Sequence, residues 1–304
     1  MPLPSFDELR AAVDAVAPRL SVAVAGATDS TVLEAVAQGK VRGWIEPILV
    51  GDASAIQATS AEAGIGVDRF RIVDDADSAR AAVAEVRSGR ARLLMKGLID
   101  TPSLMRALLN SPTGLRTDRT ICQVVLMEIV DQQRRILLAD TGITIAPTLV
   151  QKTNILLSLI ELARLLGVDR PRVALVAATE KATSAMVDTL DSAELSRRNA
   201  AGEFPDAIVE GPLSFDLAWS ADAGGKKQVA GSVVGAADAI LFPNLLAGNL
   251  TVKAMMYTAR SRFGGVLCGA ACPVIFMSRA DTLETRLNSL ALAIRMALAA
   301  DAPQ

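Results

Sequence analysis

A short polar stretch near the C-terminus, Ser278 to Glu284, places a hydroxyl, a cation and two carboxylates close together. The preceding run, Pro273 to Met277, is typical of a buried strand, and the residues after the stretch repeat apolar side chains at helical spacing. The stretch is therefore predicted to be a strand-to-helix turn. Such a turn presents free backbone N–H groups and the positive end of a helix, and here Ser278 adds a hydroxyl and Arg279 a fixed cation. This combination suits a phosphate-bearing ligand.

The carboxylates of this stretch also have a structural interpretation. Asp281 and Glu284 are three residues apart, which is the spacing of a capping box at the start of a helix. The sequence alone leaves both interpretations open.

The chain contains no histidine. This excludes Ser-His-Asp and Cys-His catalysis, histidine metal sites and histidine general bases. The three cysteines are too few and too irregularly spaced for a disulfide framework, and no C-x-x-C pair offers a zinc site, so buried thiols are expected. Any chemistry must use Arg, Lys, Ser, Thr, Asp, Glu or Cys, and no metal site is predicted.

Composition indicates a globular protein. Hydrophobic residues make up 51% of the 304 residues, yet no uninterrupted apolar run approaches the roughly 18 residues of a membrane span. The N-terminus lacks the basic and apolar regions of a signal peptide, which predicts a cytoplasmic location. The net charge of -2 and the aromatic content of 3% leave no basic, stacking-rich surface, so nucleic-acid binding is not expected.

Short β-rich runs alternate with helical patterns, which predicts βαβ units and a parallel sheet. The runs 21–26, 48–50, 70–73 and 93–95 alternate with helical patterns at 31–38, 53–63 and 77–88. Two apolar strands, "RTICQVVLMEIV" and "RRILLADTG", then predict a hairpin, and Pro147 opens a long helical pattern. We predict one α/β domain from residues 1–145 plus 280–304, and a second from residues 146–279.

Several strand ends carry candidate binding residues, because ligands of open α/β sheets bind at the carboxyl ends of the strands. Lys96 and Gly97 follow one strand, and Thr101 and Arg106 lie in the helix-like segment after it. Arg116 sits in a polar loop that could equally be only a turn. Each cation taken alone could be an ordinary solvated side chain.

Gly248 and Asn249 follow a later strand, where Gly248 is expected to expose backbone at a helix start. Such exposure is compatible with a phosphate-bearing ligand. Neither a G-x-G-x-x-G nor a G-x-x-x-x-G-K-S/T fingerprint occurs at these loops.

Taken together, these segments resemble the phosphate acetyl/butyryltransferase (phosphotransacetylase) family, most closely its phosphate butyryltransferase branch. The resemblance covers nearly the whole chain and is carried by "LLMKGLIDTPSLMRALLN", "VEGPLSFDLA", "AGNLTVKAMMYTA" and, most specifically, "PVIFMSRADTLETRLNSLALA". It implies two α/β domains with a cleft between them, similar to the isocitrate/isopropylmalate dehydrogenase-like fold, and a homodimer. It also implies reversible transfer of a short acyl group, acetyl to butyryl, between coenzyme A and inorganic phosphate, without a tightly bound cofactor.

By position, the resemblance implies that Ser278 and Arg279 lie in the phosphate and acyl site and that Arg106 is a second phosphate-binding arginine. Lys96 and Gly97 would line the same cleft, and Thr101, Arg116, Gly248 and Asn249 are further candidate substrate-binding residues. The acetyl branch has an aspartate base seven residues after the motif serine, where this chain has Thr285. Asp281 or Glu284 would have to substitute, or the reaction uses no strong base.

Other departures from the family pattern occur at Gln123, Asp188 and Leu246. They motivate an alternative hypothesis, a relative that binds acyl-CoA or acyl phosphate without turnover. An oxidoreductase on a similar fold would need a metal-binding carboxylate cluster and a nucleotide loop, and neither is recognisable in the sequence.

Overall fold

The computed structural model describes residues 1–276, 278 and 280–300. Internal contacts divide the chain into two compact units. We name the two units by their place along the sequence. The flanking unit comprises Phe6–Arg119 and Phe263–Gln304, and the central unit comprises Met1–Ser5 and Thr120–Arg262. Among the described residues, no helix combines the length and the hydropathy that a bilayer crossing requires.

The strands of the flanking unit follow the order β3-β2-β1-β4-β11-β10, and only β10 runs antiparallel to its neighbour β11. Their bounds are β1 (Leu20–Ala25), β2 (Ile45–Gly51), β3 (Arg71–Asp74), β4 (Leu93–Lys96), β10 (Ser261–Cys268) and β11 (Val274–Ile275). The helices of this unit are α1 (Phe6–Val16), α2 (Ser30–Val41), α3 (Ala53–Glu62), α4 (Ser78–Arg87), α5 (Thr101–Leu109) and α11 (Leu283–Ala300).

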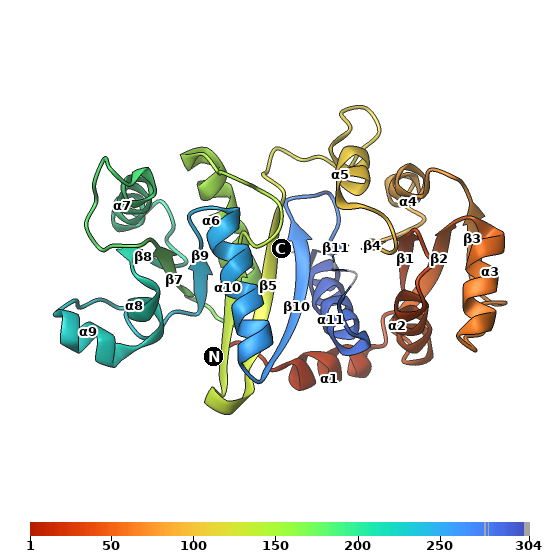
Figure 1. Ribbon diagram of the computed structural model, residues 1–304, viewed down its shortest axis with the longest axis horizontal. Helices are drawn as coiled ribbons and strands as arrows, with labels where there is room; N and C mark the ends of the chain where they lie inside the picture. The colour runs from red at the N-terminus through yellow and green to blue at the C-terminus, as the bar shows by residue number, and fades with distance from the viewer. Residues whose placement is uncertain (277, 279, 301–304) are drawn as a thin grey trace. The chain divides into compact units, whose positions relative to one another are not determined.

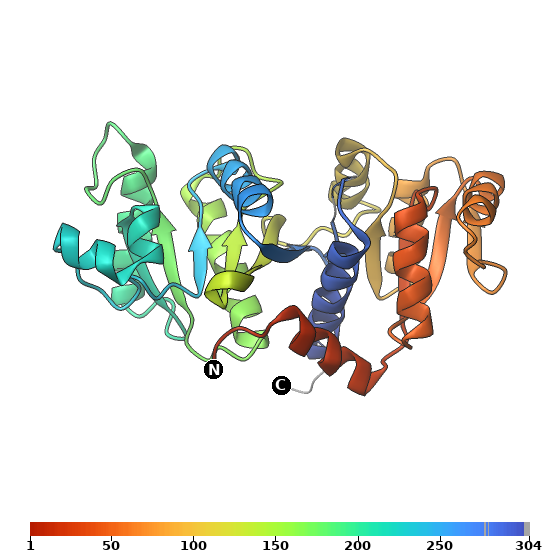
Figure 2. The ribbon, with the colours of Figure 1, turned by 60° about the horizontal axis from the view of Figure 1, so that its bottom comes forward.

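Helix α11 is the apolar centre of the flanking unit's helical layer. It contacts both α2 and α1, and α1 lies against it in Figure 2. Its buried positions run from Thr285 to Ile294 without interruption, because β10 approaches the helix closely. A side chain at Gly264 of β10 would meet the Ser289 backbone nitrogen at 2.9 Å. The absence of a Cβ at Gly264 therefore lets α11 dock against β10.

The strands of the central unit follow the order β5-β6-β9-β7-β8, parallel except for the β5–β6 hairpin. Its strands are β5 (Cys122–Ile129), β6 (Arg134–Ala139), β7 (Arg172–Val176), β8 (Ile208–Leu213) and β9 (Ala239–Leu241). Its helices, coloured green to blue in Figure 1, are η1 (Val130–Gln132), α6 (Leu149–Leu165), α7 (Val187–Ala200), α8 (Phe215–Trp219), α9 (Ala221–Lys227) and α10 (Leu245–Thr258).

The predicted α/β class and the predicted β5–β6 hairpin are both confirmed. The contacts divide the chain near residues 120 and 263, whereas the sequence suggested boundaries at 145/146 and 279/280. Strand pairing explains the difference. Leu137 of β6 pairs with Ala239 of β9, which ties the hairpin to the other strands of the central unit, and Val274 of β11 pairs with Leu94 of β4 in the flanking unit.

Candidate active site

The parallel strands β1, β4 and β11 end side by side at one edge of the flanking sheet. From β1 the chain proceeds through β2 and β3 on one side and then returns to form β4 on the other. This reversal makes β1/β4 a topological switch point, the place where open α/β sheets bind ligands. The residues that follow β4 and β11 include Gly97 and Ser278, so two of the predicted segments meet at this edge.

Gly97 is required there by close backbone packing. Its N–H donates to the Ala25 carbonyl at 2.8 Å, and a Cβ on it would lie 2.2 Å from the Gly26 carbonyl oxygen. Gly26 itself has a φ of +74°, and a Cβ there would meet the Ile99 side chain at 2.5 Å. The two glycines bring the β1 and β4 loops into contact, which a side chain at either position would prevent.

Lys96, the last residue of β4, is 4% exposed, so the interpretation of this residue as a solvated surface cation is wrong. Its Nζ lies 3.5 Å from the Gly97 carbonyl oxygen. A buried ammonium retains its charge only where polar partners compensate for lost water. Strand β4 therefore ends at the switch point with the buried, positively charged side chain of Lys96.

After β11, a reciprocal pair of hydrogen bonds joins Ser278 and Asp281 and defines the Ser278 turn. The Ser278 N–H donates to Asp281 Oδ2 at 2.6 Å, and the Asp281 N–H donates back to the Ser278 carbonyl at 3.3 Å. Helix α11 is capped instead by Thr282, whose Oγ1 accepts the Thr285 N–H at 3.3 Å. The capping-box interpretation of Asp281 is therefore wrong. Arg279 lies outside the described residues.

Arg106 lies on an exposed face of α5. Its Nη2 donates to Ser103 Oγ at 2.9 Å, and Ser103 in turn donates to Asp100, the N-cap of α5. The hydrogen bonds from Ser103 lower the pKa of Asp100. Arg106 lines a pocket of about 720 Å³ between α4 and α5, which Lys96 and Ser278 do not line. Thr101, the first residue of α5, is half-buried.

Arg116 is exposed and forms an isolated antiparallel bridge with Ala270, in the connection between β10 and β11. Thr117 supports this attachment, because its hydroxyl donates to the Gly269 carbonyl at 2.7 Å. The loop that carries Arg116 is thus held to the segment leading into β11 and the Ser278 turn.

Gly248 and Asn249 lie in the central unit, inside α10 and not at a helix start. The helix begins at Leu245, and Asn244 caps it by accepting the Ala247 N–H at 3.0 Å. A Cβ on Gly248 would lie 2.2 Å from the Asp140 carbonyl oxygen, and Asn249 Nδ2 donates to the Thr141 carbonyl at 3.0 Å. Both residues therefore fasten α10 to the end of β6, and the expected exposure of backbone at Gly248 is wrong.

Asp140, which the sequence did not single out, is a buried carboxylate at the end of β6. It accepts four backbone N–H groups at 2.8–3.2 Å, from Gln123, Gly142, Ile143 and Thr144. These bonds compensate for the carboxylate's burial and fix the loop after β6. Only the Asp-Thr-Gly turn composition after an apolar strand could have signalled it.

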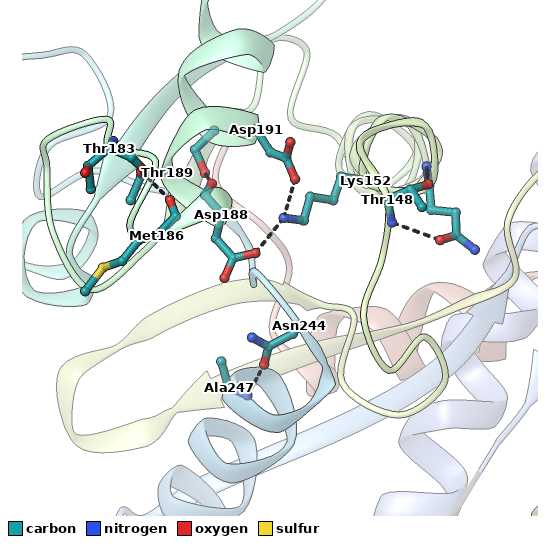
Figure 3. A network of polar contacts seen from close by, with 11 residues as sticks. Thr148, Lys152, Thr183, Met186, Asp188, Thr189, Asp191, Asn244 and Ala247 are labelled. Atoms are coloured by element: carbon teal, nitrogen blue, oxygen red, sulfur yellow. Dashed lines mark hydrogen bonds and ion pairs between the residues drawn. The ribbon is translucent and has the colours of Figure 1, made fainter.

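An ionic cluster in the central unit joins α6 to α7 (Figure 3). Lys152 of α6 is 4% exposed, and its Nζ lies 2.9 Å from Asp188 and 2.8 Å from Asp191. Asp188 and Asn244 also line a mainly apolar pocket of about 540 Å³ at the ends of β7 and β9. Lys152 was missed because a lysine inside an amphipathic helical pattern carries no sequence signal of burial.

The thiols of the three cysteines are buried or half-buried. Cys122 and Cys268 are buried, and burial raises the pKa of the Cys272 thiol to about 12. Cys272 is therefore protonated near neutral pH. The expectation of buried thiols is confirmed for Cys122 and Cys268, whereas Cys272 is half-buried. Within the described part of the chain, no group of three or more Cys, Asp or Glu residues is arranged to hold a metal ion.

Solved structures with this fold include phosphotransacylases. A branched-chain phosphotransacylase from Enterococcus faecalis V583 is 28% identical, with a TM-score of 0.79 over 91% of this chain and 99% of its own. A phosphotransacetylase from Streptococcus pyogenes shares the fold at 20% identity, with a TM-score of 0.82 over 97% of this chain and 100% of its own.

The sequence comparisons agree with this class. A phosphate butyryltransferase from Clostridium acetobutylicum is 39% identical over 91% of this chain and 93% of its own. The family described as "Phosphate acetyl/butaryl transferase" matches residues 75–294. The chain therefore belongs to the phosphate acetyl/butyryltransferase family, as the motifs predicted.

Proposed function

We propose that this protein is an acyltransferase that moves a short acyl group reversibly between coenzyme A and inorganic phosphate. Membership of the family supports the reaction class, and the observation that carries the site is the convergence of β1, β4 and β11 at the switch point of the flanking sheet. There the coenzyme A thiolate attacks the carbonyl carbon of an acyl phosphate, a C–S bond forms, the C–O bond breaks and phosphate leaves. In reverse, a phosphate oxygen attacks the thioester and releases the thiolate.

We propose that Ser278, Arg279 and Arg106 bind the phosphate and acyl groups in this reaction. A thiol with a pKa of about 8.5 is roughly 10% ionised at pH 7.5, so lack of a base costs only about 1.4 kcal/mol. Loss of one preorganised group that stabilises developing charge costs about 2.7 to 4 kcal/mol. Cations and hydroxyls should therefore contribute more than a carboxylate. Asp281 contributes by shaping the turn, since its carboxylate accepts the Ser278 N–H.

The remaining proposals rest on the family resemblance. Lys96, Gly97, Thr101 and Arg116 contribute to substrate binding from the flanking unit, and Gly248 and Asn249 do so from the central unit. Acyl-CoA, phosphate and acyl phosphate are substrates, and no cofactor is tightly bound. A cytoplasmic homodimer with an isocitrate/isopropylmalate dehydrogenase-like cleft between its two domains stays a prediction.

The first experiment is release of free thiol from acetyl-, propionyl- and butyryl-CoA, with and without inorganic phosphate. Phosphate-dependent release is expected, and the acyl chain with the highest kcat/KM reports the size of the pocket. Calorimetric binding of acyl-CoA with no release from any chain would overturn the proposal and would favour the relative that binds without turnover.

Arg279→Ala tests the assignment of the phosphate site. It should lower kcat/KM for phosphate-dependent thiol release at least tenfold, since one charge-stabilising group is lost. Arg69→Ala is a suitable control, because Arg69 is an exposed arginine of the same unit far along the chain from the motif. Full activity of the Arg279→Ala protein would place the phosphate site elsewhere.

A further inference from the structure

Arg286, in the first turns of α11, is a buried cation that the family resemblance does not assign. It is 2% exposed, and its Nη2 makes one long hydrogen bond of 3.5 Å to the Ser278 carbonyl. Its Nε is buried and has no hydrogen-bond partner among the described residues. An arginine has five N–H donors, so this guanidinium is incompletely satisfied.

The nearest carboxylate neutralises Arg286 only in part. Asp29 Oδ1 lies 3.7 Å from Nη2, at the outer limit of an ion pair. The same oxygen already accepts the Val32 N–H at 2.8 Å and the Thr31 hydroxyl at 2.7 Å, because Asp29 is the N-cap of α2. Burial lowers the pKa of Arg286, whereas Asp29 and Asp281 raise it.

We infer that Arg286 is a positioning residue for the phosphate site. Its guanidinium donates to the Ser278 carbonyl, which holds the Ser278 turn in place, and it puts a buried positive charge beside that turn. A charge in a low-dielectric environment acts on a neighbouring anion far more strongly than a solvated one does. The inference rests on the proposed acyltransferase function, and it names phosphate as the substrate whose binding Arg286 supports.

Two variants of Arg286 separate the effect of its charge from that of its packing. Arg286→Met keeps the length of the side chain and removes the charge, and it should raise KM for phosphate at least tenfold while KM for acyl-CoA changes less than twofold. Arg286→Lys keeps the charge and should hold KM for phosphate within about threefold of the wild-type value. A role limited to packing predicts that KM for both substrates stays unchanged in Arg286→Met.

Asp29→Asn gives a test of opposite sign and is informative even if Arg286→Met fails to fold. Asparagine caps helices as well as aspartate does, so α2 should persist. Removal of the Asp29 charge, which partly neutralises Arg286, should strengthen the attraction between Arg286 and phosphate. KM for phosphate should then fall about threefold. A rise in that KM, or no change in it, would contradict the inference.

Thermal unfolding with added inorganic phosphate separates this inference from the proposed reaction. Phosphate should raise the Tm of the wild-type protein through binding to the folded state, and the shift should be lost in Arg286→Met. A wild-type protein that is stabilised by phosphate but releases no thiol would refute the reaction and leave the Arg286 inference intact. Equal phosphate stabilisation of wild type and Arg286→Met, or no phosphate effect on either Tm or activity, would overturn the inference.

Discussion

The two units pack backbone at their strand ends in a similar way but neutralise a buried cation to different degrees. Each places a glycine against a strand-end carbonyl, since a Cβ would lie 2.2 Å from the facing oxygen at both Gly97 and Gly248. The flanking unit buries Arg286 as well as Lys96, and the central unit buries Lys152. In the central unit Lys152 has two carboxylates within 3 Å, whereas Arg286 of the flanking unit has one carboxylate at 3.7 Å. Backbone geometry alone therefore does not define an anion site. The two units differ in that the buried Arg286 of the flanking unit is neutralised less completely than the buried Lys152 of the central unit.

The largest effect should come from Gly97→Ala. The new Cβ meets two rigid carbonyl oxygens, of Gly26 at 2.2 Å and Ala25 at 2.8 Å, and should destabilise the protein by about 3 kcal/mol. Gly248→Ala should cost less, about 2 kcal/mol, since alanine recovers roughly 1 kcal/mol of helix propensity inside α10. Urea denaturation of both variants measures the difference in the free energy of unfolding.

Gly66→Ala is the matched control, because a Cβ there has open space and the backbone needs no positive φ. It should be neutral or slightly stabilising. If Gly97→Ala were as stable as this control, the close approach of the β1 and β4 loops would not constrain the flanking unit.

A second prediction compares the two buried cations. Lys152→Met should lower the free energy of unfolding by about 2 kcal/mol, because it leaves Asp188 and the 19%-exposed Asp191 without their shared cation. Arg286→Met should cost less than about 1 kcal/mol, because the weakly paired guanidinium carries a desolvation penalty that its removal relieves. Urea denaturation checks both values.

Lys226→Met provides the baseline for this comparison, since its ion pair with Asp222 is exposed on both sides. Its effect should lie within about 0.5 kcal/mol of zero. Equal losses for Lys152→Met and Arg286→Met would mean that the two cations are neutralised alike, and the electrostatic distinction between the units would fail.

The sequence predicted the α/β class, the hairpin and the strand-to-helix segments, because apolar periodicity and glycine-terminated strands are local signals. It placed Lys96 correctly at a strand end, but its burial depends on the neighbouring strands. It missed Arg286 for the same reason. Within a helical pattern an arginine is normally solvated, and the burial of Arg286 depends on the packing of α11 against other elements of the flanking unit.

The N-cap of α11 was predicted wrongly for a similar reason. Asp281 and Glu284 match the capping-box spacing, but Thr282 takes the cap because Asp281 is committed to the Ser278 N–H. Local spacing cannot decide between two nearby acceptors when the turn before the helix needs one of them. The division into units was likewise set by strand pairing over long sequence separations, which periodicity does not encode.

The last prediction concerns acid sensitivity at a buried carboxylate of the flanking unit. Glu85 of α4 is 4% exposed and binds Arg90 at 2.9 Å and Arg71 at 2.7 Å. The hydrogen bonds from Arg90 and Arg71 lower its pKa below the ordinary value. Its contribution to stability is therefore complete above the unfolded pKa of about 4.3 and is lost as the pH falls through the lowered folded pKa.

Glu85→Gln should lower the free energy of unfolding by about 1 kcal/mol at pH 7, since both arginines are half exposed and solvent screens them. Below the folded pKa of Glu85 the variant and the wild type should converge, because protonation has already removed the charge. Urea denaturation at a series of pH values from 7 to 3 measures this convergence. Glu62→Gln, at an exposed position of α3, should show no difference at any pH. A constant gap between Glu85→Gln and the wild type at all pH values would show that packing, and not the charge of Glu85, stabilises this part of the flanking unit.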